Sequence, residues 1–435
     1  STLADLPPAP ILVAFSGGLD STVLLHALAH SPSARKRGLR AIHVDHALHD
    51  DSAKWSQHCR TVAAALGVEI VLRGVGAPLR RAGLGLEASA RRARYGEIEK
   101  QLAPGELVAL AHHRDDQAET VLLKLLRGAG PEGLGAMRPL RRLGQGWLWR
   151  PLLGLGRVAL REYADSERLV WLTDPSNADP TIDRNFLRMQ VLPRIARRWP
   201  EVETSIAQSA AWARAAADFI NVEAKNALER IRGEEPATLR LDAWMGLPQA
   251  LRDPVLRGWL RSLGLPEPTH YQAGELVRQL AEAGEDRQPC VRWPGTEVRR
   301  YRDLLHALPP LQFPPLDWSA RFNGTDLELP IDLGTLRLVG KDAQPVFVHA
   351  LQVRFRRGGE RLRLATGGHT RELRDLFQEA GIPPWQRARL PLLFEPRGDL
   401  LAVADLWLSD AGAHLLHPLG AHIEWTPRRT APAPR

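Results

Sequence analysis

The sequence predicts an α/β protein whose N-terminal part is a doubly wound parallel sheet. Short, continuously apolar segments alternate there with segments of helical periodicity, and the first of them, Ile11–Phe15, leads directly into a Gly-Gly turn. Continuous apolar strands are typical of parallel sheets that are covered by helices on both faces. Ligands of such sheets bind beyond the carboxyl ends of the strands. The sequence therefore predicts a ligand site at that edge.

The predicted strands and helices of this part follow one another along the chain. The expected strands are Ile11–Phe15, Arg40–Val44, Glu69–Leu72, Leu107–Ala111, Trp147–Leu152 and Leu169–Leu172. The expected helices are Asp20–Ala29, Ser52–Leu66, Glu87–Leu102 and Asp115–Leu126. Strands separated by helical segments of this length favour parallel pairing through crossover connections.

Beyond this part, we expect two smaller domains and a tail. The predicted divisions are an α/β domain over 1–214, a mainly helical middle domain over 215–312, a mixed α+β domain over 313–426 and a disordered tail over 427–435. Four prolines in Leu308–Trp318 indicate a linker. The middle and C-terminal domains are both expected to contact a polyanionic partner.

Composition excludes several classes of protein. The 435 residues carry a net charge of +8, which indicates a polyanionic partner. No apolar run approaches the roughly 20 residues of a membrane span, so no membrane partner is expected. Two cysteines, Cys59 and Cys290, exclude a disulfide framework. The first 34 residues contain no Lys or Arg, so no signal peptide is expected and the predicted location is the cytoplasm.

The run Ser16–Ser21 between the first strand and the first helix predicts a phosphate site. Paired glycines allow a tight turn that exposes successive amides, and the helix N-terminus adds a positive dipole end. The alternative is a plain turn before a capped helix, but the strand before the run and the helix after it favour phosphate. We predict that the pyrophosphate part of a nucleotide is bound by Ser16, Gly17, Gly18, Leu19, Asp20 and Ser21.

The ends of the second and fourth strands lie at the same edge. His43–Leu48 follows the second strand beside the phosphate loop, a position that suits recognition of adenine or ribose, although a plain polar strand exit is the alternative. His112–Thr120 follows the fourth strand. In a helix, Asp115 and Glu119 share a face. Two adjacent aspartates and a glutamate exceed what helix capping needs, so they are expected to hold Mg²⁺ or an ammonium group.

Several segments together resemble the tRNA(Ile)-lysidine synthase family of N-type ATP pyrophosphatases. In one order along the chain they are Ser16–Ser21, His43–Leu48, Glu87–Tyr95, His112–Thr120, Leu126–Gly133, Asp174–Asn177, Arg184–Arg188, Arg299–Tyr301, Val353–Glu360 and Leu376–Phe394. The resemblance covers about Ile11 to Leu408, and it implies a Rossmann-like sheet of the adenine nucleotide alpha hydrolase type. Ala47 and Ala129 depart from the Gly and Ser of many relatives, and neither change removes a reactive group.

The resemblance implies an ATP-dependent ligase with a two-step reaction. Such enzymes transfer AMP from ATP to the 2-oxygen of the wobble cytidine in isoleucine tRNA with the anticodon CAU, and pyrophosphate is released. The amine of free L-lysine then attacks carbon 2 and expels AMP, which leaves lysidine. ATP, Mg²⁺, this tRNA and lysine are therefore the expected cofactors and partners. Both a monomer and a homodimer are compatible with the sequence.

The same resemblance, with the chemistry above, assigns expected roles to individual residues. The expected catalytic residues are Asp20, Asp45, Asp116 and Glu119; the expected metal ligands are Asp20 and Asp116. His43 and His112 are expected to join the loop in binding ATP. The expected substrate-binding residues are Arg92, Asp115, Arg184 and Asn185. The carboxylate that accepts the proton of lysine is expected to be Asp45, Asp116 or Glu119, without a choice among them. Arg92 and Arg184 are expected to bind phosphate, and the alternative for both is a salt bridge at the surface.

Two other functions are considered. A thiolation enzyme of the same nucleotide fold usually needs reactive cysteines, and this chain has no Cys-x-x-Cys. A non-catalytic tRNA-binding protein would tolerate decay of the loop and the acids, and both are present.

The C-terminal segment Val353–Phe394 is expected to bind tRNA as a domain. It contains nine arginines and four acids, with Phe355, Phe377 and Trp385 between them. Basic and aromatic side chains suit RNA backbone contacts and base stacking. Phe355 and Phe377 are expected in the core, so no single aromatic residue is assigned to RNA.

Overall fold

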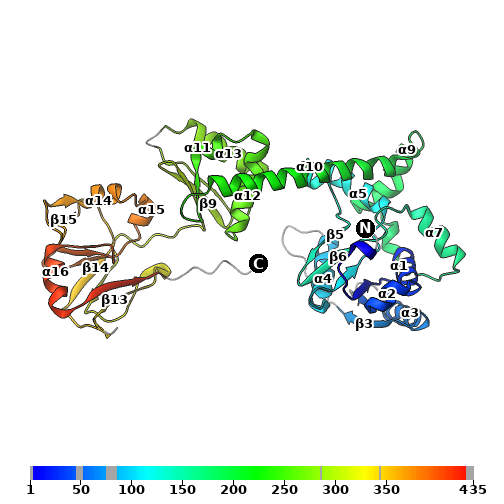
Figure 1. Ribbon diagram of the computed structural model, residues 1–435, viewed down its shortest axis with the longest axis horizontal. Helices are drawn as coiled ribbons and strands as arrows, with labels where there is room; N and C mark the ends of the chain where they lie inside the picture. Colours follow the sequence, from blue (N-terminus) through cyan, green and yellow to red (C-terminus); the bar gives the residue numbers. More distant parts are fainter. Residues whose placement is uncertain (1–2, 46–51, 75–85, 285–286, 342–343, 428–435) are drawn as a thin grey trace. The chain divides into compact units, whose positions relative to one another are not determined.

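The computed structural model describes residues 3–45, 52–74, 86–284, 287–341 and 344–427, which form two compact units, 1–220 and 221–435 (Figure 1). The predicted tail from 428 onward lies outside the described residues, as do positions 46–48 of the run after the second strand. No helix in the described part is long and apolar enough to span a membrane. Each unit is described by itself below.

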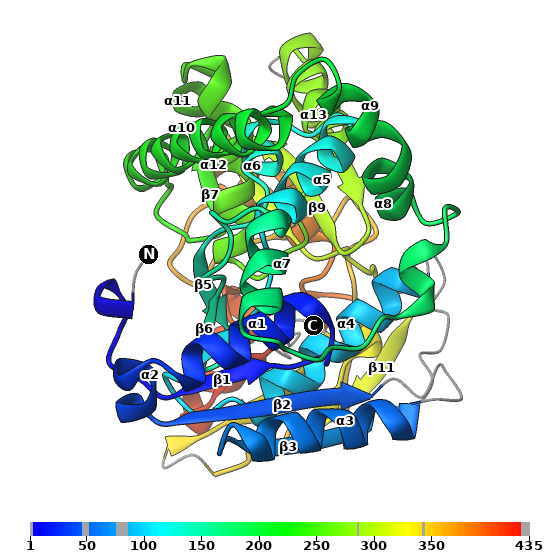
Figure 2. The same ribbon diagram turned by 90° about the vertical axis from the view of Figure 1, so that its right-hand side faces the viewer.

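The first unit is built on a six-stranded sheet in the order β3-β2-β1-β4-β6-β5. Its strands are β1 (Ile11–Ala14), β2 (Leu39–Asp45), β3 (Glu69–Gly74), β4 (Leu107–Ala109), β5 (Leu140–Leu143) and β6 (Gly146–Trp149). All neighbours pair in parallel except β5, which is antiparallel to β6. Figure 2 shows β1, β2 and β3 side by side in that order. The predicted doubly wound parallel sheet is confirmed.

Helices cover both faces of this sheet because successive residues of a strand point to opposite sides. Ile11 and Val13 of β1 pack into one core, and Leu12 packs into the other. The first core contains residues of α1 (Leu19–Ala29), α2 (Pro32–Arg37), α3 (Ser52–Ala65) and α7 (Arg157–Ser166). The second core contains residues of α4 (Leu86–Gln101). Apolar residues on both faces therefore explain the unbroken apolar strands.

The remaining helices of the first unit follow β4 and α7. They are α5 (Arg114–Leu125), α6 (Pro131–Leu134), α8 (Asp183–Phe186), a π-helical turn (Leu187–Val191), α9 (Leu192–Ala196) and the start of α10 (Val202–Ile231). Contacts join α5 to α6 and to α8. The carboxyl end of β4 is therefore followed by helices that do not cover the sheet, and they carry most of the predicted acidic site.

The predicted strand Leu169–Leu172 is wrong. Only Leu172 forms a bridge, with Gly18, and its amide donates to the Gly17 carbonyl at 2.9 Å. Leu169 and Trp171 pack against the first core, which explains their apolar character. Because the segment meets the turn after β1 and not β1 itself, no ladder extends, and Leu172 contacts the loop backbone instead.

The second unit begins with helices packed on a small antiparallel sheet. The helices are the end of α10, α11 (Leu241–Met245), α12 (Gln249–Ser262) and α13 (His270–Glu282). The sheet has the order β7-β10-β9-β8, with β7 (Thr238–Arg240), β8 (Cys290–Trp293), β9 (Thr296–Tyr301) and β10 (Leu304–Leu308). This sheet was not predicted from the sequence, where the segment was expected to be mainly helical. Their buried residues pack against α12 and α13 in one core.

The C-terminal part of the second unit is a mixed α+β lobe, as predicted. Its five-stranded sheet contains β11 (Ser319–Phe322), β14 (Leu351–Arg354), β17 (Leu392–Phe394), β18 (Leu400–Val403) and β19 (Trp407–Leu408). Smaller sheets contain β12 (Leu327–Glu328), β13 (Thr335–Val339), β20 (His422–Thr426), β15 (Arg361–Leu362) and β16 (Arg371–Glu372). The helices are α14 (Leu373–Glu379), α15 (Pro384–Arg387) and α16 (Asp410–Leu416). Phe355 and Phe377 are buried, which confirms their place in the core.

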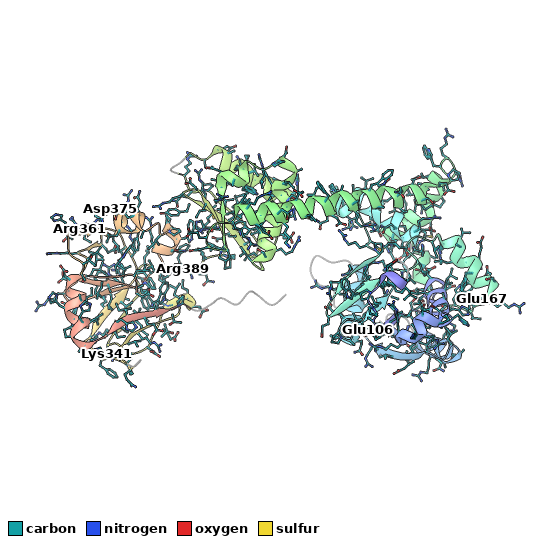
Figure 3. All side chains as sticks on the ribbon, viewed as in Figure 1. Glu106, Glu167, Lys341, Arg361, Asp375 and Arg389 are labelled. Atoms are coloured by element: carbon teal, nitrogen blue, oxygen red, sulfur yellow. The ribbon has the colours of Figure 1, made fainter. Side chains whose placement is uncertain are left out.

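Charged side chains lie at both ends of this lobe (Figure 3). Figure 3 shows Arg361 and Asp375 at that end and Lys341 at the other. Arg363 pairs with Asp410 at 2.9 Å, and its side chain stays 61% exposed. The segment Val353–Phe394 has nine arginines and four acids, so this stretch of the lobe carries a net positive charge.

Gly17 provides a test of how the loop is braced. Its φ is 83°, and an added Cβ would lie 3.0 Å from Cys59 Sγ and 3.3 Å from the Leu172 side chain. We expect Gly17→Ala to lower the free energy of unfolding by about 2 kcal/mol, because left-handed backbone strain adds to overpacking. Chemical denaturation measures this loss. Gly154→Ala, where nothing lies within 4 Å, is the control, and equal losses would contradict the brace.

His306 makes the second unit sensitive to acid. Burial lowers its pKa from 6.5 to about 4, and its Nε2 is buried without a hydrogen-bond partner in the described part of the chain. The unfolded state therefore binds a proton below pH 6.5 that the folded state rejects down to about pH 4, and stability falls as pH drops through that window.

We expect wild type to lose more thermal stability than His306→Gln between pH 7 and pH 5. The extra loss approaches about 1.4 kcal/mol per pH unit where only the unfolded histidine is charged. His349→Gln, at an exposed position, should behave as wild type. If His306→Gln keeps the full acid dependence, the destabilising proton binds elsewhere.

Candidate functional site

Hydrogen bonds close the phosphate loop on itself. The Ser21 hydroxyl donates to the Gly18 carbonyl at 3.0 Å, accepts from the Ser16 amide at 3.2 Å and lies 3.1 Å from Ser16 Oγ. The Thr22 hydroxyl also donates to the Gly18 carbonyl, at 2.9 Å. The first amides of α1 have no acceptor inside the helix and point out of its N-terminus. A phosphate group there would meet backbone donors and the positive end of the helix dipole.

A buried histidine, His43, contacts the backbone just before the phosphate loop. His43 Nδ1 lies 3.0 Å from the Phe15 carbonyl, which can only accept, so Nδ1 carries the proton. Cys59 Sγ lies 3.4 Å from the same nitrogen, and burial raises the pKa of this thiol to about 12. Burial also lowers the pKa of His43, which the bond to Phe15 and the charge of Asp45 oppose. The structure therefore places His43 beneath the loop entry, with half-buried Asp45 at the end of β2.

Asp20, His113 and Asp116 come together at the carboxyl edge of the sheet. His113 Nε2 lies 3.7 Å from Asp20 Oδ2 and 3.5 Å from Asp116 Oδ2. The His113 amide donates to Asp116 Oδ2 at 3.1 Å. Asp20 comes from the first turn of α1, and the other two come from the start of α5. The structure thus brings together two predicted catalytic carboxylates, with an imidazole that was not among the predicted site residues.

Arg188 binds the other predicted carboxylate. Its Nε and Nη2 donate to the two oxygens of Glu119 at 2.6 and 3.0 Å, and Nη2 also donates to Asp116 Oδ1 at 3.1 Å. Glu119 is fully buried, and the two parallel bonds are the geometry of an ionised carboxylate with a guanidinium. Arg184 lies further away, with Nε 3.7 Å from Glu119 Oε2, and it donates to Thr120 Oγ1 at 3.2 Å.

Burial and charge act in opposite directions on these carboxylates. Burial raises the pKa of Asp20, and the charges of His113, Arg157 and Arg188 oppose the rise. Burial also raises the pKa of Glu119, which Arg188 opposes through its hydrogen bonds and charge. For Asp116, burial is outweighed by His113, His112, the His113 amide and Arg184, so its pKa is lowered. Asp116 is therefore the most readily ionised of the three, relative to its ordinary value.

His112 is fixed as a neutral side chain. Arg150 Nε donates to His112 Nδ1 at 3.1 Å, and burial lowers the pKa of the imidazole to about 3. Because Nδ1 accepts, the proton of the neutral ring is on Nε2. The predicted nucleotide-binding histidine can therefore donate a hydrogen bond but carries no charge at neutral pH.

The structure gives the contacts or the exposure of three predicted substrate-binding residues, Asp115, Asn185 and Arg92. Asp115 Oδ2 accepts from the Arg157 amide at 3.3 Å and so caps the start of α7. Asn185 is buried, and its amide donates to the Asp179 carbonyl at 2.9 Å. Arg92 is exposed on α4. The contacts of the first two are those of residues that hold the backbone.

Sequence reasoning missed His113, Arg150 and Arg188 as site residues. His113 is adjacent to the predicted His112, but its neighbours on α1 are distant in sequence. Arg188 follows Arg184 by one helical turn, which was a usable signal. Arg150 comes directly after β6, beyond the predicted centre of the site.

Each part of the chain matches a described domain family. Residues 2–195 match the PP-loop domain, residues 239–306 the TilS substrate binding domain and residues 351–425 the TilS substrate C-terminal domain.

Curated relatives match over nearly the full chain. A protein of Xanthomonas campestris pv. campestris (strain 8004) is 43% identical and covers 98% of this chain and 97% of its own length. One of Alkalilimnicola ehrlichii is 44% identical over 93% and 91% of the two chains. One of Pseudomonas aeruginosa is 39% identical over 97% and 94%. All three are named tRNA(Ile)-lysidine synthase. With three matching domains and relatives of this identity, the chain belongs to the tRNA(Ile)-lysidine synthase family.

Proposed function

We propose that this chain is an ATP-dependent ligase that joins lysine to carbon 2 of the wobble cytidine of isoleucine tRNA, forming lysidine. One observation carries the proposal: the phosphate loop lies next to a buried group of carboxylates, because Asp20 of α1 meets His113 and Asp116 of α5. A pyrophosphate-releasing step and an amine-handling step need these two features side by side.

In the first step, the 2-oxygen of the cytidine attacks the α-phosphorus of ATP and pyrophosphate leaves. The loop amides and the hydroxyls of Ser16 and Ser21 stabilise the negative charge of the leaving pyrophosphate. Neutral His112 can donate a hydrogen bond from Nε2, so it suits the nucleotide without adding charge. His43 stays beneath the loop, where its bond to Phe15 holds the backbone in place.

The donor set fits a divalent cation in part. Asp20 Oδ1 is buried and has no hydrogen-bond partner among the described residues. Both oxygens of Asp116 accept hydrogen bonds, from the His113 amide and from Arg188. No group of three such ligands is present within the described ranges, so phosphate oxygens would have to complete the shell. Mg²⁺ held there by Asp20, with Asp116 as a second ligand, would offset the charge of the phosphates.

In the second step, the lysine amine must lose a proton before it attacks carbon 2. We assign the binding of the ammonium and the acceptance of its proton to Asp116, which is ionised and close to the loop. Glu119 is less suited to this role because its side chain has no exposed surface, whereas the side chain of Asp116 is 11% exposed. Glu119 and Arg188 instead position Asp116. Asp45 remains a second proton acceptor, and Arg92 and Arg184 remain proposed phosphate partners of the substrates.

The C-terminal lobe is proposed to bind the tRNA. Its exposed arginines provide the sequence-independent attraction to a phosphate backbone. A thiolation reaction is disfavoured by Cys59, whose raised pKa and buried position make it a poor nucleophile. The direct experiment mixes the protein with ATP, labelled lysine and isoleucine tRNA bearing CAU. Incorporation of label into that tRNA supports the proposal, and its absence would refute it.

Asp20→Asn tests the role of the carboxylate at the loop. We expect pyrophosphate release to fall by at least a hundredfold, because a charge that acts in the transition state is worth roughly 3 kcal/mol or more. Binding of the tRNA, measured by filter retention, should stay within twofold of wild type. Asp165→Asn, in an exposed pair on α7, is the matched control. Loss of tRNA binding and of pyrophosphate release together would show that Asp20 is structural.

Arg188→Gln tests the positioning of Asp116. Removing one partner of a buried pair typically costs about 3–5 kcal/mol, so Arg188→Lys is made beside it to keep a folded protein. Without the guanidinium, both Asp116 and Glu119 lose a neighbouring positive charge, so the pKa of each rises. We expect the acidic limb of the pH profile of lysine transfer to move to higher pH in both variants.

Adenylation should change less than lysine transfer in these variants. Arg161→Gln, which breaks an exposed pair on the same unit, should leave both profiles unchanged. A uniform loss of both steps with an unshifted profile would contradict a positioning role for Arg188.

A further inference from the structure

Two segments that are distant in sequence meet within the second unit. Arg299 and Tyr301 belong to β9, whereas Trp385 and Arg387 belong to α15. Arg387 Nη2 donates to the Tyr301 hydroxyl at 3.0 Å, and the Tyr301 and Trp385 ring centroids are 6.1 Å apart. The Arg299 guanidinium lies 5.3 Å from the centroid of the Trp385 ring. None of these residues has a part in the chemistry above.

A cavity of about 240 Å³ lies at this meeting point. It is lined by Gln288, Arg299, Phe313, Pro384 and Trp385. Pockets for drug-sized ligands hold about 300–1,000 Å³, so this one suits a single planar ring system. A second cavity of about 400 Å³ shares Gln288 with it and is also lined by Arg287. A ligand longer than one ring could therefore continue along the same face.

Two of the three apolar residues that line the cavity, Phe313 and Trp385, are aromatic. Trp385 is only 5% exposed, so its ring is held in place by the surrounding side chains, whereas Phe313 is 45% exposed. Phe313 lies between β10 and β11, next to Pro314 and Pro315, which stiffen the chain. An exposed phenylalanine on a stiff linker costs free energy in water unless a partner covers it. Aromatic walls of this kind stack on flat rings, and nucleobases of any identity have such a face.

The polar groups of the cavity suit the edge and the phosphate of a nucleotide. Arg299 uses Nε and Nη2 to bind Glu297, and its side chain also lines the cavity. The exposed amide of Gln288 offers both a donor and an acceptor, as the edge of a base requires. Arg287 is exposed beside it and can meet a neighbouring phosphate.

We propose that this cavity receives an unpaired nucleobase of the tRNA, stacked on its aromatic walls. The inference rests on the proposed function, since it names which chemical part of the RNA this unit recognises. Duplex RNA hides the faces of its bases, so the site reads a single-stranded nucleotide and not a helix. The same ring could come from a free nucleotide, and the test below separates the two sources.

The test uses the full chain and a fluorescent single-stranded RNA of six nucleotides. Fluorescence anisotropy gives the dissociation constant, and a hairpin that pairs the same six nucleotides is measured in parallel. We expect the single strand to bind more tightly than the hairpin. Phe313→Ala should weaken its binding roughly tenfold, as expected for loss of one stacking partner. Gln288→Ala, also at an exposed position, should weaken it by a smaller factor.

Phe347→Ala is the matched control, because Phe347 is 66% exposed on the same unit and does not line the cavity. Wild-type affinity in Phe313→Ala and Gln288→Ala, or equal binding of strand and hairpin, would overturn the proposal. Displacement of the RNA by AMP at an equal concentration of bases would also overturn it, in favour of a free-nucleotide site.

Lysine transfer separates this proposal from the function it rests on. If the proposal holds, Phe313→Ala raises KM for tRNA and leaves kcat unchanged. If wild type itself transfers no lysine while the RNA binding result stands, the proposed function fails and the nucleobase site remains.

Discussion

The bidentate pair of Arg188 and Glu119 is the interaction on which the site depends. Glu119 has no exposed surface, and a buried carboxylate is stable only when a partner compensates its charge. Arg188 lies in a π-helical turn, a distortion that often occurs at functional sites, and it reaches Asp116 with the same guanidinium. The pair therefore joins α5 to the chain that follows α8. It also fixes Asp116 and His113 opposite Asp20, so the step that uses the loop and the step that uses lysine share one rigid frame.

The charge of the chain is divided between two kinds of surface. The phosphate loop contains no basic residue, so it can hold an anion only through amides, hydroxyls and the helix dipole. Such groups are fixed by the fold and do not reorganise during the reaction. Within the second unit, the segment Val353–Phe394 has nine arginines and four acids, which suits long-range attraction of a large polyanion. The site acids Asp20, Asp116 and Glu119 are opposite in sign to the net charge of +8, as the binding of an ammonium group requires.

Local sequence patterns were enough to predict the parallel sheet, the loop and the acidic run. Each of these features depends on neighbours along the chain: an apolar strand, two glycines, or acids in a first helical turn. Leu169–Leu172 shows the limit of this reasoning, because its apolar residues pack as a brace and not as a strand. The sheet formed by β7 to β10 was missed for a related reason, since its strands are stabilised by packing against α12 and α13. His113 and Arg188 gain their roles from contacts with α1 and α5, which no local pattern contains. Asp115 and Asn185 match the family motifs, yet the structure shows them holding backbone.

The most direct test of the account is whether AMP is attached to the tRNA before lysine arrives. ATP labelled at the α-phosphate is mixed with the protein and isoleucine tRNA bearing CAU, without lysine, and the RNA is isolated. The account predicts label on the wobble cytidine, and its release as AMP when lysine is added. Absence of labelled RNA, or pyrophosphate release that requires lysine, would contradict a loop and an acid cluster that act in two successive steps.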